Sequence, residues 1–332
     1  ILSGKNNQLF YSRRVGRSPH GRAPYEAEYS RVPENVTILG AAKLSGRTAG
    51  GLSIGALAAV TGDEYGESVF ADGSRSDFLV EPRSEVGVLS LAKDFGEGAS
   101  QIQGLVSGLR RQLPGDGSYD WLASSAFNGG FRLDHRWRDG KYGVLAFVTG
   151  SHVRGAEEAV TRLQRASNHY FQRPDATRVS LDETATSMSG LTWRFNLEKR
   201  EGEHWTGRVW TSQVTSGFEI NELGFYPTAE RLHAGAIINY KEIVPGRLFR
   251  SYSFGGITYH NWSHEVLDDI WSSGSWRDAW MRGVFTANAN GKFLNYWNLR
   301  TSATYTPRAM SRSATRGGPM MVRPGSSKWS VN

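Results

Sequence analysis

The sequence contains no cysteine, so disulfide bonds, thiolate metal sites and cysteine nucleophiles are excluded. It also lacks any apolar run of the roughly 18–20 residues that a membrane helix needs. The longest such stretch lies around Ile54 to Val60 and is interrupted by Gly55. These absences do not exclude a membrane protein, because a closed β-barrel satisfies its backbone internally without a long apolar run. Charged residues make up 21% of the chain, which excludes wholesale disorder.

Aromatic residues and glycine are abundant instead. The chain has 11 Trp, 13 Tyr, 15 Phe and 39 Gly among 332 residues. Aromatic side chains favour strands, and glycine favours tight turns. A formal net charge of +7 permits anionic partners without requiring them. We expect no cofactor and no nucleic-acid partner.

Alternation of apolar and polar residues is the clearest pattern. In Leu191–Glu198 the odd positions are apolar and the even positions are polar, as the period of a strand requires. The segments 127–137, 281–290 and 296–305 repeat this pattern. About thirteen segments of this kind are predicted, and a further one near Lys328; the thirteen start near residues 9, 36, 52, 85, 100, 122, 142, 186, 204, 231, 247, 278 and 293.

The connections between these segments alternate between short and long. Tight turns are predicted at 49–51, 96–98, 139–141, 201–203, 245–247 and 290–292. Long connections are predicted at 17–35, 62–84, 112–120, 154–184, 218–229, 263–277 and 307–325. In an up-and-down antiparallel sheet every second connection lies on the same rim, an asymmetry typical of outer-membrane barrels.

The predicted fold is therefore all-β: a transmembrane antiparallel up-and-down β-barrel of about 14 or more strands. Its short turns are expected to be periplasmic and its long loops extracellular. Residues 1–332 form one barrel domain, which we expect to be incomplete at both ends because thirteen strands and a fragment do not make the usual even number. The connection 154–184 is predicted to be an extracellular loop with a short helix at Ala156–Arg165. The alternative is a soluble lipocalin-like barrel, sandwich or propeller.

Three stretches resemble a Gram-negative outer-membrane β-barrel family of unknown function: Phe10–Arg17, Gly40–Thr48 and His169–Ala176. Members of that family usually carry an N-terminal domain similar to family 9 carbohydrate-binding modules. The resemblance implies the cell outer membrane as location, and saccharides as ligands. The carbohydrate-binding-like domain is absent from this sequence, so a sugar-binding role of that domain does not transfer to these residues.

The polar faces of the predicted strands carry mostly basic side chains. We expect these residues to line the lumen and to contact ligands or ions: Lys43, Arg47, Arg132, Asp134, Arg136, Arg194, Glu198, Lys241, Arg282 and Arg300. One interpretation is that they fill and hydrate a wide lumen. The other is an anion-attracting channel or a site for anionic glycans, because a focused positive potential concentrates anions. Arg13, Arg14 and Arg17 are expected to anchor the first strand.

Motifs that carry catalytic chemistry are weak in this sequence. Ser53 lies in a nucleophile-elbow pattern, but inside a predicted strand and not on the sharp turn that the motif needs. His260 and His264 lack a carboxylate that would complete a zinc signature. Ser151 and His152 are a candidate hydrolase pair without an identifiable orienting partner. Asp134 and Glu198 are candidate carboxylates for glycoside hydrolysis, but they belong to strands separated in sequence. We therefore assign no catalytic, cofactor-binding or metal-binding residue and favour a protein that is not an enzyme.

Three functions remain open at this point. The first is an integral outer-membrane barrel for passage, capture or display of ligands at the cell surface, with saccharides or other anionic ligands. The second is a structural or interaction subunit with a plugged lumen, which binds other outer-membrane or surface proteins. The third is a surface carbohydrate-active hydrolase. In the first two, outer-membrane lipid surrounds the barrel.

Overall fold

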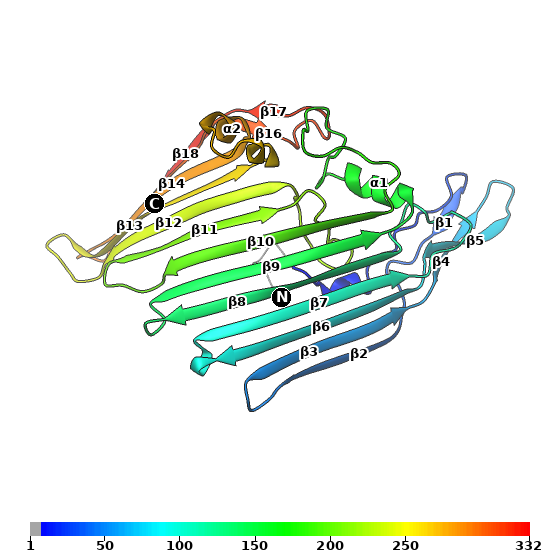
Figure 1. The fold of residues 1–332 in the computed structure, drawn as a ribbon, viewed down its shortest axis with the longest axis horizontal. Helices are drawn as coiled ribbons and strands as arrows, with labels where there is room; N and C mark the ends of the chain where they lie inside the picture. Colours follow the sequence, from blue (N-terminus) through cyan, green and yellow to red (C-terminus); the bar gives the residue numbers. More distant parts are fainter. Residues whose placement is uncertain (1–7) are drawn as a thin grey trace.

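A computed structural model describes residues 8–332. Its main feature is one large antiparallel sheet (Figure 1). Thirteen strands form it: β2 (Ile38–Arg47), β3 (Leu52–Thr61), β6 (Ser84–Phe95), β7 (Ser100–Arg111), β8 (Ser125–Trp137), β9 (Tyr142–Arg154), β10 (Ser187–Lys199), β11 (Trp205–Val214), β12 (Arg231–Glu242), β13 (Phe249–Trp262), β14 (Trp280–Phe293), β15 (Asn298–Thr306) and β18 (Ser326–Val331). Each begins within five residues of a predicted start, so the all-β prediction is confirmed.

The sheet is open in the described residues, with β2 at one edge and β18 at the other. The expected closed barrel is therefore not observed. Every neighbouring pair is antiparallel, so after twelve steps the two edge strands run in the same direction. Direct pairing of β2 with β18 would be parallel, which is not the pattern of an up-and-down barrel.

Tight turns lie along one rim of the sheet and long connections along the other (Figure 1). We call these the turn rim and the loop rim. Five of the six predicted turns separate paired strands as expected, but the turn predicted at 290–292 is wrong. Residues 290–292 continue β14, and the chain reverses after Phe293, where Tyr296 N–H donates to the Phe293 carbonyl.

The long connections carry the remaining elements. A small sheet contains β1 (Tyr29–Arg31), β4 (Glu64–Val69) and β5 (Arg75–Glu81), and β16 (Ala309–Ser311) pairs with β17 (Met321–Arg323). The connection after β9 holds α1 (Glu157–Arg165), and the one after β13 holds η3 (His264–Asp268) and α2 (Ser273–Asp278). The turn after β6 is the short η2 (Gly96–Gly98). None of the helices in residues 8–332 is long and apolar enough to cross a membrane.

Two segments cover one face of the sheet, and together we call them the plug: residues 8–20 and 215–230. Val15 and Leu223 of the plug pack with Val86 and Leu109 of the sheet. Phe218 packs in a second cluster that includes Leu105. We call this side the covered face and the opposite side the open face. In Figure 1 the blue N-terminal segment lies behind the strands.

The first predicted strand, near residue 9, is wrong. Ser12–Arg14 instead forms a short 3-10 helix, η1, within the plug. Its neighbours bond to the other plug segment rather than to a strand ladder: Tyr11 N–H donates to the Leu223 carbonyl at 2.8 Å. Buried backbone groups need partners, and this segment finds them in residues 223–225.

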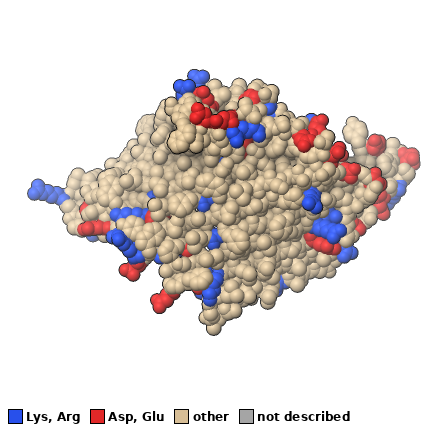
Figure 2. All heavy atoms as spheres, in the orientation of Figure 1, with Lys and Arg blue, Asp and Glu red and all other residues tan. Residues whose placement is uncertain are grey.

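The open face is apolar in its middle. Large side chains there are exposed, among them Phe131 (68%), Val209 (51%) and Leu197 (43%). Along the thirteen strands as described, charged side chains of this face lie within three residues of a strand end. Figure 2 shows the charged atoms gathered mostly toward the margins of this side. A water-facing sheet surface would carry polar residues at alternate positions along the strand.

Aromatic side chains flank this apolar middle at both rims. Near the turn rim, the Tyr240 ring lies 5.0 Å from Trp205 and 4.8 Å from Phe254. Near the loop rim, Trp262 lies 5.1 Å from Trp276. Phe254 and Trp262 both lie on β13, and eight residues of strand span about 27 Å. Aromatic girdles that border an apolar band about 25 Å tall are typical of membrane barrels.

Gly190 allows the plug to approach the sheet. A Cβ atom at this position would clash with the backbone nitrogen of Phe218. We expect Gly190→Ala to destabilise the fold by about 1–3 kcal/mol, because the plug backbone has to shift. Gly87→Ala is the matched control, since a Cβ there meets nothing within 4 Å. Urea unfolding of both variants checks this, and equal midpoints would contradict the close approach.

Candidate functional site

The covered face carries all ten side chains that the sequence predicts for a lumen. One row of directly opposed residues crosses eleven strands and includes four of the arginines. It runs Arg47, Ser53, Ala92, Gln103, Arg132, Phe147, Arg194, Ser212, His233, Asn261 and Arg282. Register alone therefore places residues from distant parts of the chain on one line. Their contact with ligands or ions remains a prediction.

Some of these charges are neutralised within the face. Asp134 lies 3.4 Å from Arg132 Nη2 and 3.5 Å from Arg136 Nε. Arg47 pairs with Asp94 at 2.6 Å. Asp94 is an acidic residue on this face that the predicted lining set does not include. The excess of basic over acidic side chains is therefore smaller than that set suggests.

The remaining predicted residues fall into separate places. Glu198 opposes Arg208 in the register and lies 3.4 Å from Arg200. Lys241 and Arg300 share a shallow hollow of about 560 Å³ at the turn rim. Lys43 lies on the edge strand β2 and is exposed. The ten residues thus share a face but do not form one compact site.

A buried ionic cluster fastens the plug to the sheet. Arg111, at the end of β7, donates from Nη2 to Glu222 Oε2 at 2.7 Å, and its Nε lies 3.6 Å from Glu81 Oε1. His20 donates its backbone N–H to Glu81 at 2.8 Å. Burial opposes ionisation of Glu222, but the charge and hydrogen bond of Arg111 outweigh it and hold the pKa of Glu222 below its ordinary value. The cluster therefore joins both plug segments to one guanidinium.

Arg17 belongs to the motif Phe10–Arg17 and lies near this cluster. Burial lowers its pKa, and the charges of Glu222 and Glu81 oppose that shift. Arg13 instead lies 6.0 Å from the Tyr11 ring. The three motif arginines were expected to anchor a first strand; the segment is not a strand, and Arg17 lies near these two carboxylates.

A second ionic cluster ties four long connections together at the loop rim. Arg312 donates to Glu230 at 2.7 Å and to the Ala229 carbonyl at 2.6 Å. Arg173 donates to Glu265 at 3.2 Å. Burial raises the pKa of Glu230, and Arg312 offsets this only in part. Charge pairs with little solvent access fix the relative positions of the loops that carry them.

His264 makes this loop cluster sensitive to acid. Burial lowers the pKa of His264 to about 4, below its ordinary 6.5. The unfolded chain therefore binds a proton first as the pH falls, and stability decreases from about pH 6.5 downward. Between pH 7.5 and pH 5 we expect His264 to contribute a loss of about 2 kcal/mol to the free energy of unfolding. Thermal unfolding at both pH values checks this.

The variant His264→Gln is the control for this pH effect. It removes the titrating group, so its unfolding temperature is expected to change less between pH 7.5 and pH 5 than that of the wild type. Glu81 and Glu222 have lowered pKa values and contribute only at more acidic pH. An equal change in both proteins would contradict the assignment to His264.

The hydrolase pair Ser151 and His152 does not come together. These consecutive strand residues point to opposite faces. Ser151 Oγ accepts a hydrogen bond from Glu219 N–H beneath the plug at 2.9 Å, whereas His152 Nδ1 lies 2.7 Å from Ser189 Oγ. Ser53 lies within β3 rather than on a turn. Residues 8–332 hold no group of three or more potential metal ligands among His, Asp and Glu.

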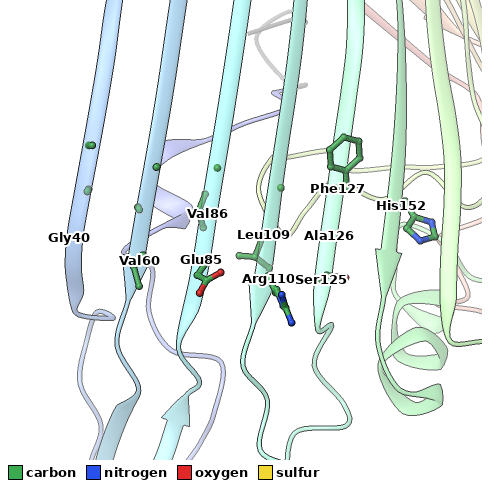
Figure 3. A pocket seen from close by; sticks show the side chains of 16 residues that line it. Gly40, Val60, Glu85, Val86, Leu109, Arg110, Ser125, Ala126, Phe127 and His152 are labelled. Carbon is green, nitrogen blue, oxygen red and sulfur yellow. The ribbon is translucent and has the colours of Figure 1, made fainter.

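A shallow groove of about 860 Å³ lies at the loop-rim ends of β2, β3 and β6 to β9 (Figure 3). Small residues make up its floor, including Ala42, Ala58, Gly87 and Gly108. Phe127 and His152 stand at one end. It is a feature of the open-face surface and lies apart from the ten predicted residues.

Sequence reasoning missed both ionic clusters and the plug. Glu81, Glu222, Glu230 and Arg312 lie in, or at the ends of, long connections, where no periodicity indicates which way a side chain points. Among the residues of the two clusters named here, only Arg111 lies in a segment whose alternation predicts a strand. Consecutive strand residues point to opposite faces, and Arg110 faces the open side, so the alternation could have placed Arg111 on the covered face.

Residues 4–104 match a family described as a domain of unknown function (DUF5916). The match contains two of the three resembling stretches, Phe10–Arg17 and Gly40–Thr48, and covers the first plug segment through β6. It covers less than a third of the chain and describes no activity. No curated protein matches the sequence.

Proposed function

We propose that this chain forms the wall of an outer-membrane β-barrel with a plugged interior, which captures ligands from the loop side and does not conduct ions. The observation that carries the proposal is the contrast between the two faces. The open face is apolar and bordered by aromatic rims, whereas the covered face carries the ten charged lining residues and packs against the plug. A wide barrel needs lipid on its apolar side and places polar groups inside.

The plug favours capture over passage. It spans strands of the first half of the sheet through Leu105, Val86 and Leu109, and Arg111 holds it there. At the loop rim, the ionic cluster around Glu230 joins the plug segment 215–230 to the other long connections. Saccharides or other anionic ligands would meet basic side chains that the plug leaves accessible, such as exposed Arg282.

Two measurements on the full chain test this function. After expression with an export signal, membranes are extracted at alkaline pH and floated on a density gradient, and the chain is expected to stay with the lipid. Release into the supernatant would overturn the membrane placement. In planar bilayers the purified protein is expected to give no steady conductance, and steady ion flow would overturn the plug and favour passage.

The plugged interaction subunit is the second candidate, and one surface feature favours it. Trp271, in the connection after β13, is 90% exposed, and its neighbour Ile270 is 46% exposed. Exposed aromatic residues on a loop are typical contacts of a protein partner. Cross-linking through position 271 in intact outer membranes would capture such a partner, and cross-links to lipid alone would exclude this contact.

A further inference from the structure

A small pocket at the loop-rim end of the covered face is lined by four arginines. They are Arg231 on β12, Arg282 on β14, Arg312 before β17 and Arg323 on β17. The volume is about 220 Å³, and no Asp or Glu is among its lining residues. Arg231 and Arg282 lie on the large sheet, whereas Arg312 and Arg323 belong to the segment of the paired strands β16 and β17. The pocket therefore forms because this segment folds back over the sheet.

Most of this positive charge has no partner in the described residues. Arg312 is neutralised by Glu230 at 2.7 Å. Arg231, Arg282 and Arg323 form no ion pair within residues 8–332. The Arg231 Nε atom is buried and has no hydrogen-bond partner in the described structure. A buried guanidinium donor without a partner is costly, and a bound anion would satisfy it.

The other lining groups suit an oxyanion. Tyr170, Thr228 and Ser313, which carry hydroxyl groups, line the same pocket. Arg323 Nη2 already donates to Ser311 Oγ at 3.2 Å, which leaves its other donors available. The Arg282 guanidinium lies 5.7 Å from the Tyr259 ring centre, so a neighbouring aromatic surface supports it. Planar guanidinium donors recognise phosphate in a bidentate manner.

We propose that this pocket binds the phosphate group of a small phosphorylated ligand, such as a sugar phosphate. Three uncompensated guanidinium groups match a dianion better than a single carboxylate, and hydroxyl donors complete a tetrahedral shell. A volume of about 220 Å³ holds a phosphate together with part of a compact attached group. The inference rests on the proposed capture role and names its ligand class.

Titration calorimetry of the full chain in detergent, at fixed chloride concentration, tests the site with glucose 6-phosphate. Wild type is expected to bind it and to ignore glucose. Arg231→Met and Arg282→Met are each expected to weaken binding at least tenfold. Arg308→Met is the matched control, because Arg308 is exposed in the same segment as Arg312 but does not line the pocket.

The outcomes separate this site from the proposed function. Wild-type protein that binds no glucose 6-phosphate, or an equal loss in the Arg308→Met control, would overturn the pocket. Equal binding of glucose and glucose 6-phosphate would overturn the phosphate assignment. Because binding is measured in detergent, none of these results bears on membrane placement. Arg282→Lys keeps the charge and is expected to retain part of the affinity, which separates loss of charge from loss of fold.

Discussion

The substitution Phe131→Arg is expected to destabilise the protein in a lipid bilayer by about 2–4 kcal/mol, the cost of a cation on the lipid face near the middle of a barrel strand. Phe131 lies on β8, is 68% exposed on the open face, and has no charged neighbour on that face within its own row. In water the same substitution at so exposed a position would change stability by no more than about 0.5 kcal/mol. The large effect therefore requires lipid.

Phe131→Leu is the control for Phe131→Arg, because it removes the ring and keeps the side chain apolar. Urea unfolding from phospholipid vesicles gives the free energies of unfolding of both variants. We also expect less folded Phe131→Arg than Phe131→Leu in isolated membranes. Equal stability of the two variants in vesicles would mean that the open face does not contact lipid.

Loss of the Arg111 guanidinium is expected to cost about 3–5 kcal/mol, because Arg111→Met removes the cation that pairs with the carboxylates of Glu81 and Glu222. Arg111 is 5% exposed and Glu81 is 4% exposed, so water does not replace the lost charge. Both plug segments lose their fastening, and residues 8–20 become accessible to protease. Trypsin is then expected to cleave after Arg13, Arg14 or Arg17 at a rate well above that in wild type.

Arg110→Met is the matched control for Arg111→Met. Arg110 is the preceding residue of β7, faces the open side and forms no ion pair in the described part of the chain. It is expected to change stability by about 0.5 kcal/mol or less. The double variant Arg111→Met/Glu222→Gln should recover part of the loss, because one buried carboxylate is then neutral. Unchanged trypsin cleavage in Arg111→Met would contradict the proposed fastening of the plug.

Strand positions could be predicted well from the sequence, because alternation is a local property. In Leu191–Glu198 the alternation alone separates an apolar face from a polar face, and the segment lies within the observed strand β10. The turn at 290–292 was wrong because Asn290–Gly291 is a strong local turn signal. In the structure, Gly291 instead packs against the Phe249 ring of the neighbouring strand, and β14 continues to Phe293.

The plug and the two ionic clusters could not be predicted, because they depend on contacts across large separations in sequence. Arg111 and Glu222 meet 111 residues apart, and Arg312 and Glu230 meet 82 residues apart. The alternation of each strand predicts the face on which every lining residue lies. It does not predict that Asp94 neutralises Arg47, because Asp94 lies at the end of a strand, where the alternation fades.

The most direct test of the lipid-facing open side uses two adjacent positions on β11. The chain has no cysteine, so V209C and R208C variants each carry a single label site. Val209 faces the open side and Arg208 the covered side. In membranes that contain the full chain, a spin label at 209 is expected to be relaxed by oxygen dissolved in the lipid. A label at 208 is expected to be relaxed by a water-soluble nickel chelate or to be shielded from both reagents. Relaxation of the label at 209 by the nickel chelate would contradict a lipid-facing open side.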